Sequence, residues 1–261
     1  MDTYVEHNAK AWDWEVTRHN IWTDGCSDEQ IEKAKNGVLD MVLSPFKTVP
    51  STWLPDLPGK QVLALACGGG QQGVLLSLAQ AKVTVFDIST NQLAQDKKYA
   101  EKLNLDLDCI QGDMQDLSCF ADSRFDVVFN PTSSCVIDDV VGMYRQVYII
   151  LKPGGYFLTS ITNPALYLFD EKKVMKERLH VKYTLPYSDL RSISKKELEK
   201  KMKKHDTLEF SHTLADLLCG LTDVGFILTD MYTDKAGFMM IDSFLHDCYL
   251  SVRAKKEEKC L

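Results

Sequence analysis

The chain has 261 residues, of which 45% are hydrophobic and 26% are charged, and its formal net charge is −7. This composition is typical of a globular protein with a sizeable core, and it excludes a disordered tail, a fibrous repeat and a small disulfide-rich scaffold. The negative charge offers no general attraction to nucleic acid or anionic lipid, and no apolar run approaches the ~18 residues that a membrane span needs. We therefore expect no nucleic-acid partner and no membrane.

The cysteines and histidines lack the spacings of metal sites and of disulfide frameworks. No two of the eight cysteines, from Cys26 to Cys260, form a CxxC pair, and the six histidines contain no HxH or HxxxH group. Buried free cysteine behaves as a small hydrophobic residue, so we expect free thiols and no metal. Because residues 1–20 carry acidic side chains and no apolar core, they are unlike a signal peptide. These features favour a cytoplasmic location.

Residues 1–58 precede the regular part of the chain and are predicted to be a helical extension. An apolar stripe at helical spacing near its start predicts a helix that packs on the rest of the protein. The members of the stripe are Val5, Ala9, Trp12 and Val16. Trp14, His19 and Trp22 lie off this stripe, which makes them candidates for contacting a substrate. We expect residues 1–22 to form a lid, because a ligand at a sheet edge must be shielded from water.

From residue 61, short apolar runs alternate with helical patterns, which indicates buried parallel strands in β-α-β units. The runs that predict parallel strands are residues 61–66, 82–86, 105–110, 125–129 and 156–161. Residues 226–232 and 244–252 predict two further strands, whose short connection permits antiparallel pairing but no parallel crossover. The predicted fold is therefore α/β: a Rossmann-like three-layer sandwich with a mostly parallel seven-stranded sheet and an antiparallel last strand.

Start and stop signals place helices between these strands. Ser89 and Gln92 are expected to form a capping box, with the Ser89 hydroxyl accepting from the Gln92 N–H and the Gln92 side chain reaching back. An apolar stripe over residues 140–151 predicts a helix that the following KPGG sequence ends. A leucine stripe over residues 214–221 predicts another helix, closed by Gly225.

The main domain is expected to span residues 59–261, and residues 164–206 interrupt its strand–helix alternation as an insertion. The lysine-rich stretch in residues 195–204 is typical of a solvated helix face. Tyr167 and Tyr183 are candidates for stacking on a substrate, but the same tyrosines could pack the insertion against the rest of the protein. Both interpretations stay open at the level of the sequence.

The segment CGGGQQG at residues 67–73 joins the first predicted strand to the first helix. Glycine lets the backbone turn sharply and approach a ligand closely. Gly68, Gly70 and Gly73 complete a GxGxxG pattern, and Asp87 ends the next strand, where an acid can accept both hydroxyls of a ribose. Two cofactors fit this half-site: a nicotinamide dinucleotide and S-adenosylmethionine.

The loops after the later strands distinguish these two cofactors. The sequence GDM at residues 112–114 follows the third strand, FDVVFN forms the fourth, and ILKPGGYF leads into the fifth. In this order, residues 60–163 resemble the class I S-adenosylmethionine-dependent methyltransferases. The nearest subgroup looks like the small-molecule enzymes akin to ubiquinone and menaquinone methyltransferases. The reversed strand at the end of the predicted sheet also suits this family.

The resemblance implies cofactor contacts from the loops after the first four strands. They are Ala66, Cys67, Gly68 and Gly70 at the methionine end, Asp87 at the ribose, Ile88, Asp113 and Met114 around the adenine, and Asn130 beside the sulfonium. The family usually shows a DxGxGxG pattern, whereas Ala64 and Ala66 stand at its acid and its first glycine. The cofactor's ammonium would then be held by a residue of the N-terminal extension or by the Ala66 carbonyl.

We therefore expect an S-adenosylmethionine-dependent methyltransferase that acts on an unidentified, small-molecule acceptor. Two alternatives use the same glycine loop: an NAD(P)-dependent oxidoreductase, and a non-catalytic cofactor-binding protein of the same fold. The sequence identifies neither a catalytic residue nor an oligomeric state.

Overall fold

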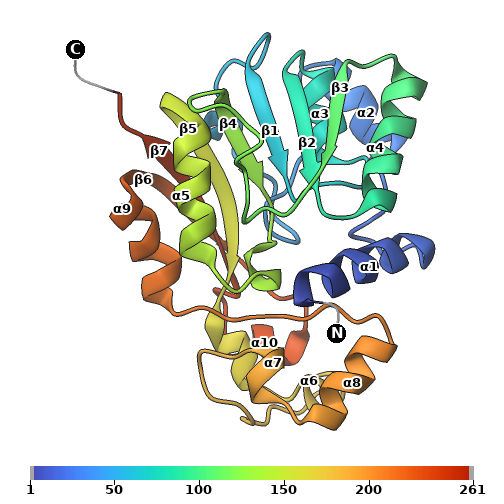
Figure 1. The fold of residues 1–261 in the computed structure, drawn as a ribbon, viewed down its shortest axis with the longest axis vertical. Helices are drawn as coiled ribbons and strands as arrows, with labels where there is room; N and C mark the ends of the chain where they lie inside the picture. The colour runs from blue at the N-terminus through green and yellow to red at the C-terminus, as the bar shows by residue number, and fades with distance from the viewer. Residues whose placement is uncertain (1–2, 259–261) are drawn as a thin grey trace.

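The computed structural model describes residues 3–258, which contain one seven-stranded sheet (Figure 1). The strands are β1 (Gln61–Leu65), β2 (Lys82–Asp87), β3 (Leu107–Gln111), β4 (Phe125–Asn130), β5 (Leu151–Thr162), β6 (Phe226–Asp234) and β7 (Tyr249–Lys256). Their order is β3-β2-β1-β4-β5-β7-β6; β1 to β5 are parallel, and β7 is antiparallel to both of its neighbours. This arrangement confirms the predicted α/β sandwich with its reversed last strand.

Helices cover both faces of the sheet, which gives the fold its three layers (Figure 1). One face carries α2 (Asp28–Lys35), α3 (Gln72–Leu78) and α4 (Thr90–Leu103). The other face carries α5 (Val140–Ile150), a π-helical turn η4 (Ala215–Cys219) and α9 (Gly220–Val224), which ends at Gly225 as predicted. Each layer of helices buries its own hydrophobic cluster against the sheet.

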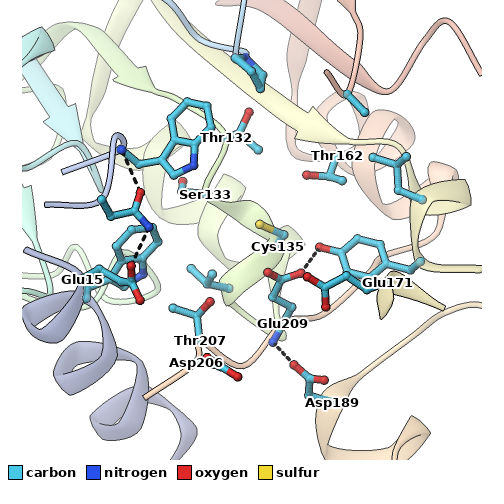
Figure 2. Close-up of a pocket in the computed structure, with 18 of the residues that line it drawn as sticks. Glu15, Thr132, Ser133, Cys135, Thr162, Glu171, Asp189, Asp206, Thr207 and Glu209 are labelled. Atoms are coloured by element: carbon cyan, nitrogen blue, oxygen red, sulfur yellow. Dashed lines mark hydrogen bonds between the residues drawn. The ribbon is translucent and has the colours of Figure 1, made fainter. Parts of the chain in front are cut away.

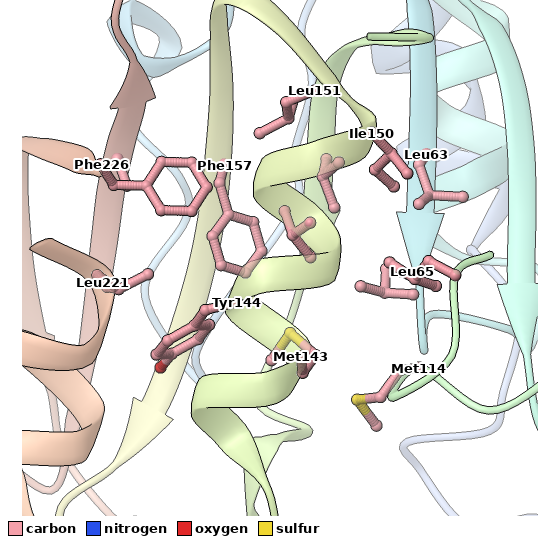
Figure 3. Close-up of a cluster of buried hydrophobic side chains, with 14 of the residues drawn as sticks. Leu63, Leu65, Met114, Met143, Tyr144, Ile150, Leu151, Phe157, Leu221 and Phe226 are labelled. Carbon is pink, nitrogen blue, oxygen red and sulfur yellow. The ribbon is translucent and has the colours of Figure 1, made fainter. Parts of the chain in front are cut away.

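Aromatic side chains fix α5 on its face of the sheet (Figure 3). Tyr144 and Met143 are completely buried, and the Tyr144 ring lies 6.0 Å from that of Phe157 in β5. The Tyr144 hydroxyl donates to the Leu217 carbonyl at 3.3 Å. Burying one large apolar side chain contributes roughly 1.5–3 kcal/mol, so this cluster makes a rigid support for the loops at the carboxyl edge of the sheet.

The last strand is shifted from its predicted position over residues 244–252. It begins at Tyr249, because β6 ends at Asp234, which is the register partner of Tyr249. The Cys248 N–H still donates to the Asp234 carbonyl at 2.9 Å, but the residues before Cys248 extend past the end of β6. Phe244, which the alternating pattern placed on the buried face, is 74% exposed.

The fifth strand begins earlier than predicted. Leu151 directly follows α5 and already pairs with Phe125 of β4, and a bulge separates this pair from the next, Val127 with Tyr156. The KPGG sequence ends α5 as predicted, but it lies inside β5. A proline and two glycines are tolerated there because the strand is irregular at this point.

The remaining helices gather at the carboxyl ends of the parallel strands (Figure 1). The 3₁₀ turn η3 (Pro164–Leu168), α6 (Glu171–Val174), α7 (Asp189–Ser192) and α8 (Lys195–Lys203) form a lobe there, and α10 (Met239–Asp242) lies nearby. The N-terminal helix α1 (Tyr4–Thr17) lies between this lobe and the strand tips. Two further 3₁₀ turns are η1 (Ser51–Trp53) and η2 (Ser134–Val136).

The seven cysteines within residues 3–258 are all free thiols. Cys260 lies outside the described residues. In the same range, no helix is both long and apolar enough to cross a membrane.

Candidate active site

The loop between β1 and α3 turns sharply at the carboxyl edge of the sheet. Gly69 and Gly70 have φ angles of 113° and 79°, in the left-handed region that favours glycine. Ala66 also has a positive φ, of 49°. A Cβ atom on Gly73 would lie 2.6 Å from the Val85 side chain, so this glycine allows α3 to approach β2 closely.

A buried aspartate of α4 holds this loop in place. The Asp96 carboxylate accepts hydrogen bonds from the Gly69 and Gly70 N–H groups at 2.8 and 3.0 Å. Asp96 is completely buried, and this burial raises its pKa to about 7. Sequence reasoning missed Asp96, although it lies four residues before the buried Ala100 and therefore on the inner face of the helix.

Asp87, at the end of β2, holds the start of the same loop. Its Oδ2 accepts from the Gly68 N–H and its Oδ1 from the Ser89 N–H, both at 2.9 Å. Ser89 caps α4 as predicted, because its hydroxyl accepts from the Gln92 N–H at 3.1 Å. The second bond of the predicted capping box differs: the Ser89 N–H donates to Asp87 and not to the Gln92 side chain. Burial raises the pKa of Asp87 against these backbone hydrogen bonds. Two lone pairs of the carboxylate remain for the hydroxyls of a ligand.

A cavity of about 950 Å³ opens in front of this loop. The wall at the carboxyl ends of β1 and β2 consists of Ala66, Cys67, Gly68, Asp87 and Ile88. The opposite wall comes from the lobe, and Trp12 and Trp22 also line the cavity. Glu15 lies on the side next to α1 (Figure 2). Small-molecule sites have volumes of ~300–1,000 Å³, so this cavity is large enough for two ligands side by side.

A narrow slot extends from the cavity beneath α1. Tyr4 and Asn8 of α1 form one side, and Ile88, Asp113 and Met114 form the other. The slot has a volume of about 30 Å³, which is roughly the share of one molecule in liquid water. The slot thus lies between α1 and the loops that follow β2 and β3, and it is lined by both apolar and polar side chains.

Polar side chains fasten α1 over the slot. Asn8 is buried; its amide donates to the Leu208 carbonyl at 3.0 Å and accepts from the Leu208 N–H at 2.8 Å. Asp13 accepts from the Ser89 hydroxyl at 2.6 Å and from the Asn91 N–H at 2.9 Å. The helix thus bridges the segment after α8 and the start of α4.

The structure brings most of the predicted cofactor contacts to the cavity or its slot. Those that line either space are Ala66, Cys67, Gly68, Asp87, Ile88, Asp113 and Met114. Gly70 lies behind the loop instead, where a Cβ atom would be 2.6 Å from the Tyr99 ring. Asn130 is completely buried and donates to the Leu65 carbonyl at 2.9 Å and to the Ser133 hydroxyl at 2.7 Å. It connects the ends of β1 and β4 and does not line the cavity.

The predicted substrate contacts divide in the same way. Those that line the cavity are Trp22, Tyr167 and Tyr183. Trp14 is 43% exposed and packs on His205, and the His19 side chain is 88% exposed beyond the end of α1. The reason is that α1 buries His7, Asn8 and Ala11 and not the predicted stripe. This rotation turns Trp12 into the cavity and Trp14 away from it.

Sequence reasoning also missed two carboxylates in the cavity, Glu15 and Glu209, which Figure 2 shows on different sides of it. The Glu15 side chain is 16% exposed; its Oε2 accepts from the Asn20 amide at 2.6 Å, and its Oε1 lies 3.5 Å from the exposed Arg18 guanidinium. Glu15 lies three residues after Trp12, so both side chains lie on one face of α1. This spacing is the sequence signal that could have predicted Glu15 as a cavity residue. Glu209 follows α8, in a segment without a recognisable motif.

Comparisons with known proteins agree with this fold and this cavity. Residues 63–159 match the family model described as a methyltransferase domain. A Bacillus subtilis (strain 168) protein described as uncharacterized methyltransferase YbaJ is 40% identical over 256 residues, which cover 98% of this chain and 100% of that protein. The chain therefore belongs to the class I S-adenosylmethionine-dependent methyltransferases. Its cofactor is S-adenosylmethionine, and it transfers a methyl group to an acceptor.

Two further matches are more distant. The ubiquinone biosynthesis O-methyltransferase of Azotobacter vinelandii is 31% identical over 114 residues. The match covers 43% of this chain and 49% of that protein. The crystal structure of Burkholderia thailandensis 1,6-didemethyltoxoflavin-N1-methyltransferase, with bound 1,6-didemethyltoxoflavin and S-adenosylhomocysteine, superposes with a TM-score of 0.56. It is 14% identical and covers 97% of this chain and 88% of its own, so it shows the likeness of the fold.

Proposed function

We propose that the acceptor is a small molecule, bound in the lobe side of the cavity opposite the cofactor. The observation that supports this proposal is the continuity of the cavity, which joins the glycine-loop wall to the wall formed by the lobe. The small-molecule names of the Azotobacter and Burkholderia relatives agree with it. The cytoplasmic location expected from the sequence stays a prediction.

The residues at the carboxyl edge fit S-adenosylmethionine. The free lone pairs of Asp87 suit the two ribose hydroxyls, and Ile88 and Met114 offer apolar surfaces for an adenine ring. Bound S-adenosylmethionine supplies a methyl group on a sulfonium that is already an activated leaving group. The residues of this chain then have to align the acceptor with that methyl group and exclude water.

Glu15 is our candidate for holding the cofactor's ammonium. The usual acid of the family is replaced by Ala64, which is completely buried in β1. Glu15 reaches the cavity from α1 and lines it together with Gly68 of the glycine loop. Because a carboxylate with a hydrogen-bonded ammonium is a charge-assisted pair, the N-terminal extension would supply the charge that the first strand lacks.

We further propose that residues 1–58 act as a lid and that the inserted lobe forms the acceptor wall. The slot beneath α1 is too small for a purine in this structure. Entry of the adenine therefore requires α1 to move outwards, and its return would cover the cofactor.

Calorimetry with two ligands and two variants tests this arrangement. S-Adenosylhomocysteine carries the amino-acid group, whereas 5′-methylthioadenosine lacks it. Glu15→Gln should weaken the binding of S-adenosylhomocysteine by about 1.5–3 kcal/mol and leave the binding of 5′-methylthioadenosine unchanged. Asp87→Asn should weaken the binding of both ligands. Asp108→Asn, which changes an exposed carboxylate of β3, is the matched control.

Equal effects of Glu15→Gln on both ligands would contradict the role of Glu15. Tighter binding of NADH than of S-adenosylhomocysteine would contradict the cofactor site as a whole. Asp87→Asn should also lower the free energy of unfolding, since the Gly68 and Ser89 N–H groups compete for one remaining acceptor oxygen.

A further inference from the structure

The lobe side of the cavity combines three tyrosines with Glu209, a carboxylate that forms no salt bridge within the described residues. The Tyr167 and Tyr187 rings stack with centroids 5.5 Å apart, and Tyr183 meets Tyr187 edge-on at 4.9 Å. The Tyr167 hydroxyl donates to Oε2 of Glu209 at 2.9 Å. Figure 2 shows the Glu209 carboxylate and the Cys135 thiol close together at the cavity.

Two of the lysines that line the cavity pair with other carboxylates. Lys201 binds Asp189 at 2.7 Å, and Lys182 lies 3.6 Å from Asp170 and 3.7 Å from Glu197. Within residues 3–258, no lysine, arginine or histidine lies within salt-bridge distance of Glu209, although the Lys201 charge acts on it from further away and lowers its pKa against the larger effect of burial, which raises it.

Asp189, in contrast, is saturated. It is completely buried, and besides Lys201 it accepts from the Tyr187 hydroxyl at 2.6 Å and from the Glu209 N–H at 2.8 Å. The charge of Asp189 is thus neutralised by Lys201 inside the protein. The Glu209 carboxylate instead lines the cavity. A half-buried carboxylate without a salt bridge attracts a cation, and tyrosine rings beside it add cation–π attraction.

The protonation states of the neighbouring groups also favour a cation beside Glu209. Burial raises the pKa of Cys135 to about 12, with the Glu209 charge as a further cause, and burial raises the pKa of Tyr167 well above its usual value. Both groups therefore keep their protons at neutral pH. Burial also raises the pKa of Glu209, which makes its carboxylate a stronger base than an exposed glutamate.

We propose that this part of the cavity binds the methyl acceptor as an amine, with Glu209 holding its ammonium group and accepting the proton that the amine must lose. This inference rests on the proposed small-molecule function of the same cavity. Transfer forms one C–N bond and breaks one C–S bond, which leaves a neutral thioether. The amine's proton moves to Glu209 and then to water, and the methylated product leaves as an ammonium ion.

Matched amine and alcohol pairs test the proposal without knowledge of the natural acceptor. The pairs are phenethylamine with 2-phenylethanol, tryptamine with tryptophol, and cyclohexylmethylamine with cyclohexanemethanol. Each is titrated into the full-length protein saturated with S-adenosylhomocysteine at pH 7. At least one amine should bind ten times or more tightly than its alcohol, because the ammonium replaces the missing partner of Glu209.

Glu209→Gln should abolish this preference, while S-adenosylhomocysteine affinity stays unchanged. The control Glu199→Gln removes an exposed carboxylate of α8 and should keep the preference. If an amine turns over with S-adenosylmethionine, Glu209→Gln should slow that turnover by about 100-fold or more, the usual contribution of general base catalysis.

The outcomes separate the two proposals. Equal affinity within every pair, or an amine preference that survives Glu209→Gln, would overturn the assignment of an amine acceptor. Preference for an alcohol would point to hydroxyl methylation and overturn it as well. Failure of S-adenosylhomocysteine itself to bind would instead contradict the proposed function.

Discussion

Ala66 holds a left-handed backbone conformation at the start of the glycine loop, with a φ of 49°. The family usually has a glycine at this position, and a side chain with a Cβ atom in this conformation costs roughly 1–2 kcal/mol. The hydrogen bond from the Ala66 N–H to the Phe86 carbonyl, at 2.8 Å, helps to hold the turn.

Ala66→Gly should therefore stabilise the protein. Glycine removes the steric cost but gains chain entropy in the unfolded state, so the free energy of unfolding should rise by at most about 1 kcal/mol. Ala64→Gly, two residues earlier in the regular part of β1, is the matched control and should lower it. Chemical denaturation measures both changes, and equal destabilisation by the two variants would contradict the strain at Ala66.

Asp96 gives the glycine loop a dependence on pH. Its pKa is raised to about 7 in the folded protein by burial, against an ordinary value near ~3.9 in the unfolded chain. The folded state thus binds the Asp96 proton more tightly, so the stability linked to it is present at low pH and is lost as the pH rises towards about 7.

Asp96→Asn removes this titration. The difference in unfolding free energy, wild type minus variant, should fall steadily between about pH 5 and pH 8. At every pH the variant should be less stable, because one of the two glycine N–H groups loses its acceptor at a cost of about 1–3 kcal/mol. Denaturation at four pH values is the measurement. A pH-independent difference would show that Asp96 is ionised throughout this range.

At the scale of elements, α1 shows what periodicity can predict and what it cannot. The helix itself was predicted from its stripe, and the structure confirms it. Its buried face is polar in part, with His7 and Asn8, because α1 packs on an extended segment whose backbone needs hydrogen-bond partners. An apolar stripe does not reveal such a surface, which explains why the roles of Trp12 and Trp14 were exchanged.

Asn8→Ala should loosen α1 without unfolding the sandwich. The Leu208 N–H and carbonyl would lose their partners on α1, which costs about 1–3 kcal/mol. Because α1 contributes no side chain to either hydrophobic cluster of the sheet, the cost should appear as local opening. S-Adenosylhomocysteine should bind about tenfold or more weakly, with little change in the thermal unfolding midpoint.

Asn36→Ala, at the exposed end of α2, provides the control for this variant and should leave the affinity unchanged. A large fall in the unfolding midpoint of Asn8→Ala at unaltered ligand affinity would contradict the lid and make α1 a purely structural helix.

For the molecule as a whole, the sheet was more predictable than the site. Buried parallel strands appear as continuous apolar runs between helices, so the order of elements and the glycine loop followed from the sequence. The loop after each strand could also be assigned, as Asp87 and Met114 illustrate. Asn130 was misassigned because a polar residue at a strand end can serve either a ligand or the backbone of neighbouring strands.

The other parts of the site depend on contacts between distant segments. Glu209 faces the cavity only because the chain after α8 returns to lie beside Cys135 and Tyr167. Asn8 meets Leu208 for the same reason. No local sequence pattern predicts these contacts, because they result from how the lobe and α1 pack together at the carboxyl edge of the sheet.

The claim that a cofactor binds at this edge beneath α1 is tested most directly by amide hydrogen exchange with and without S-adenosylhomocysteine. The structure predicts that amides of α1, in residues 4–17, gain protection together with those of residues 66–73 and 112–116. In the proposed arrangement the adenine binds in the slot beneath α1, so this helix would cover it. Protection confined to residues 66–73 and 112–116, with unchanged exchange in α1, would contradict the account.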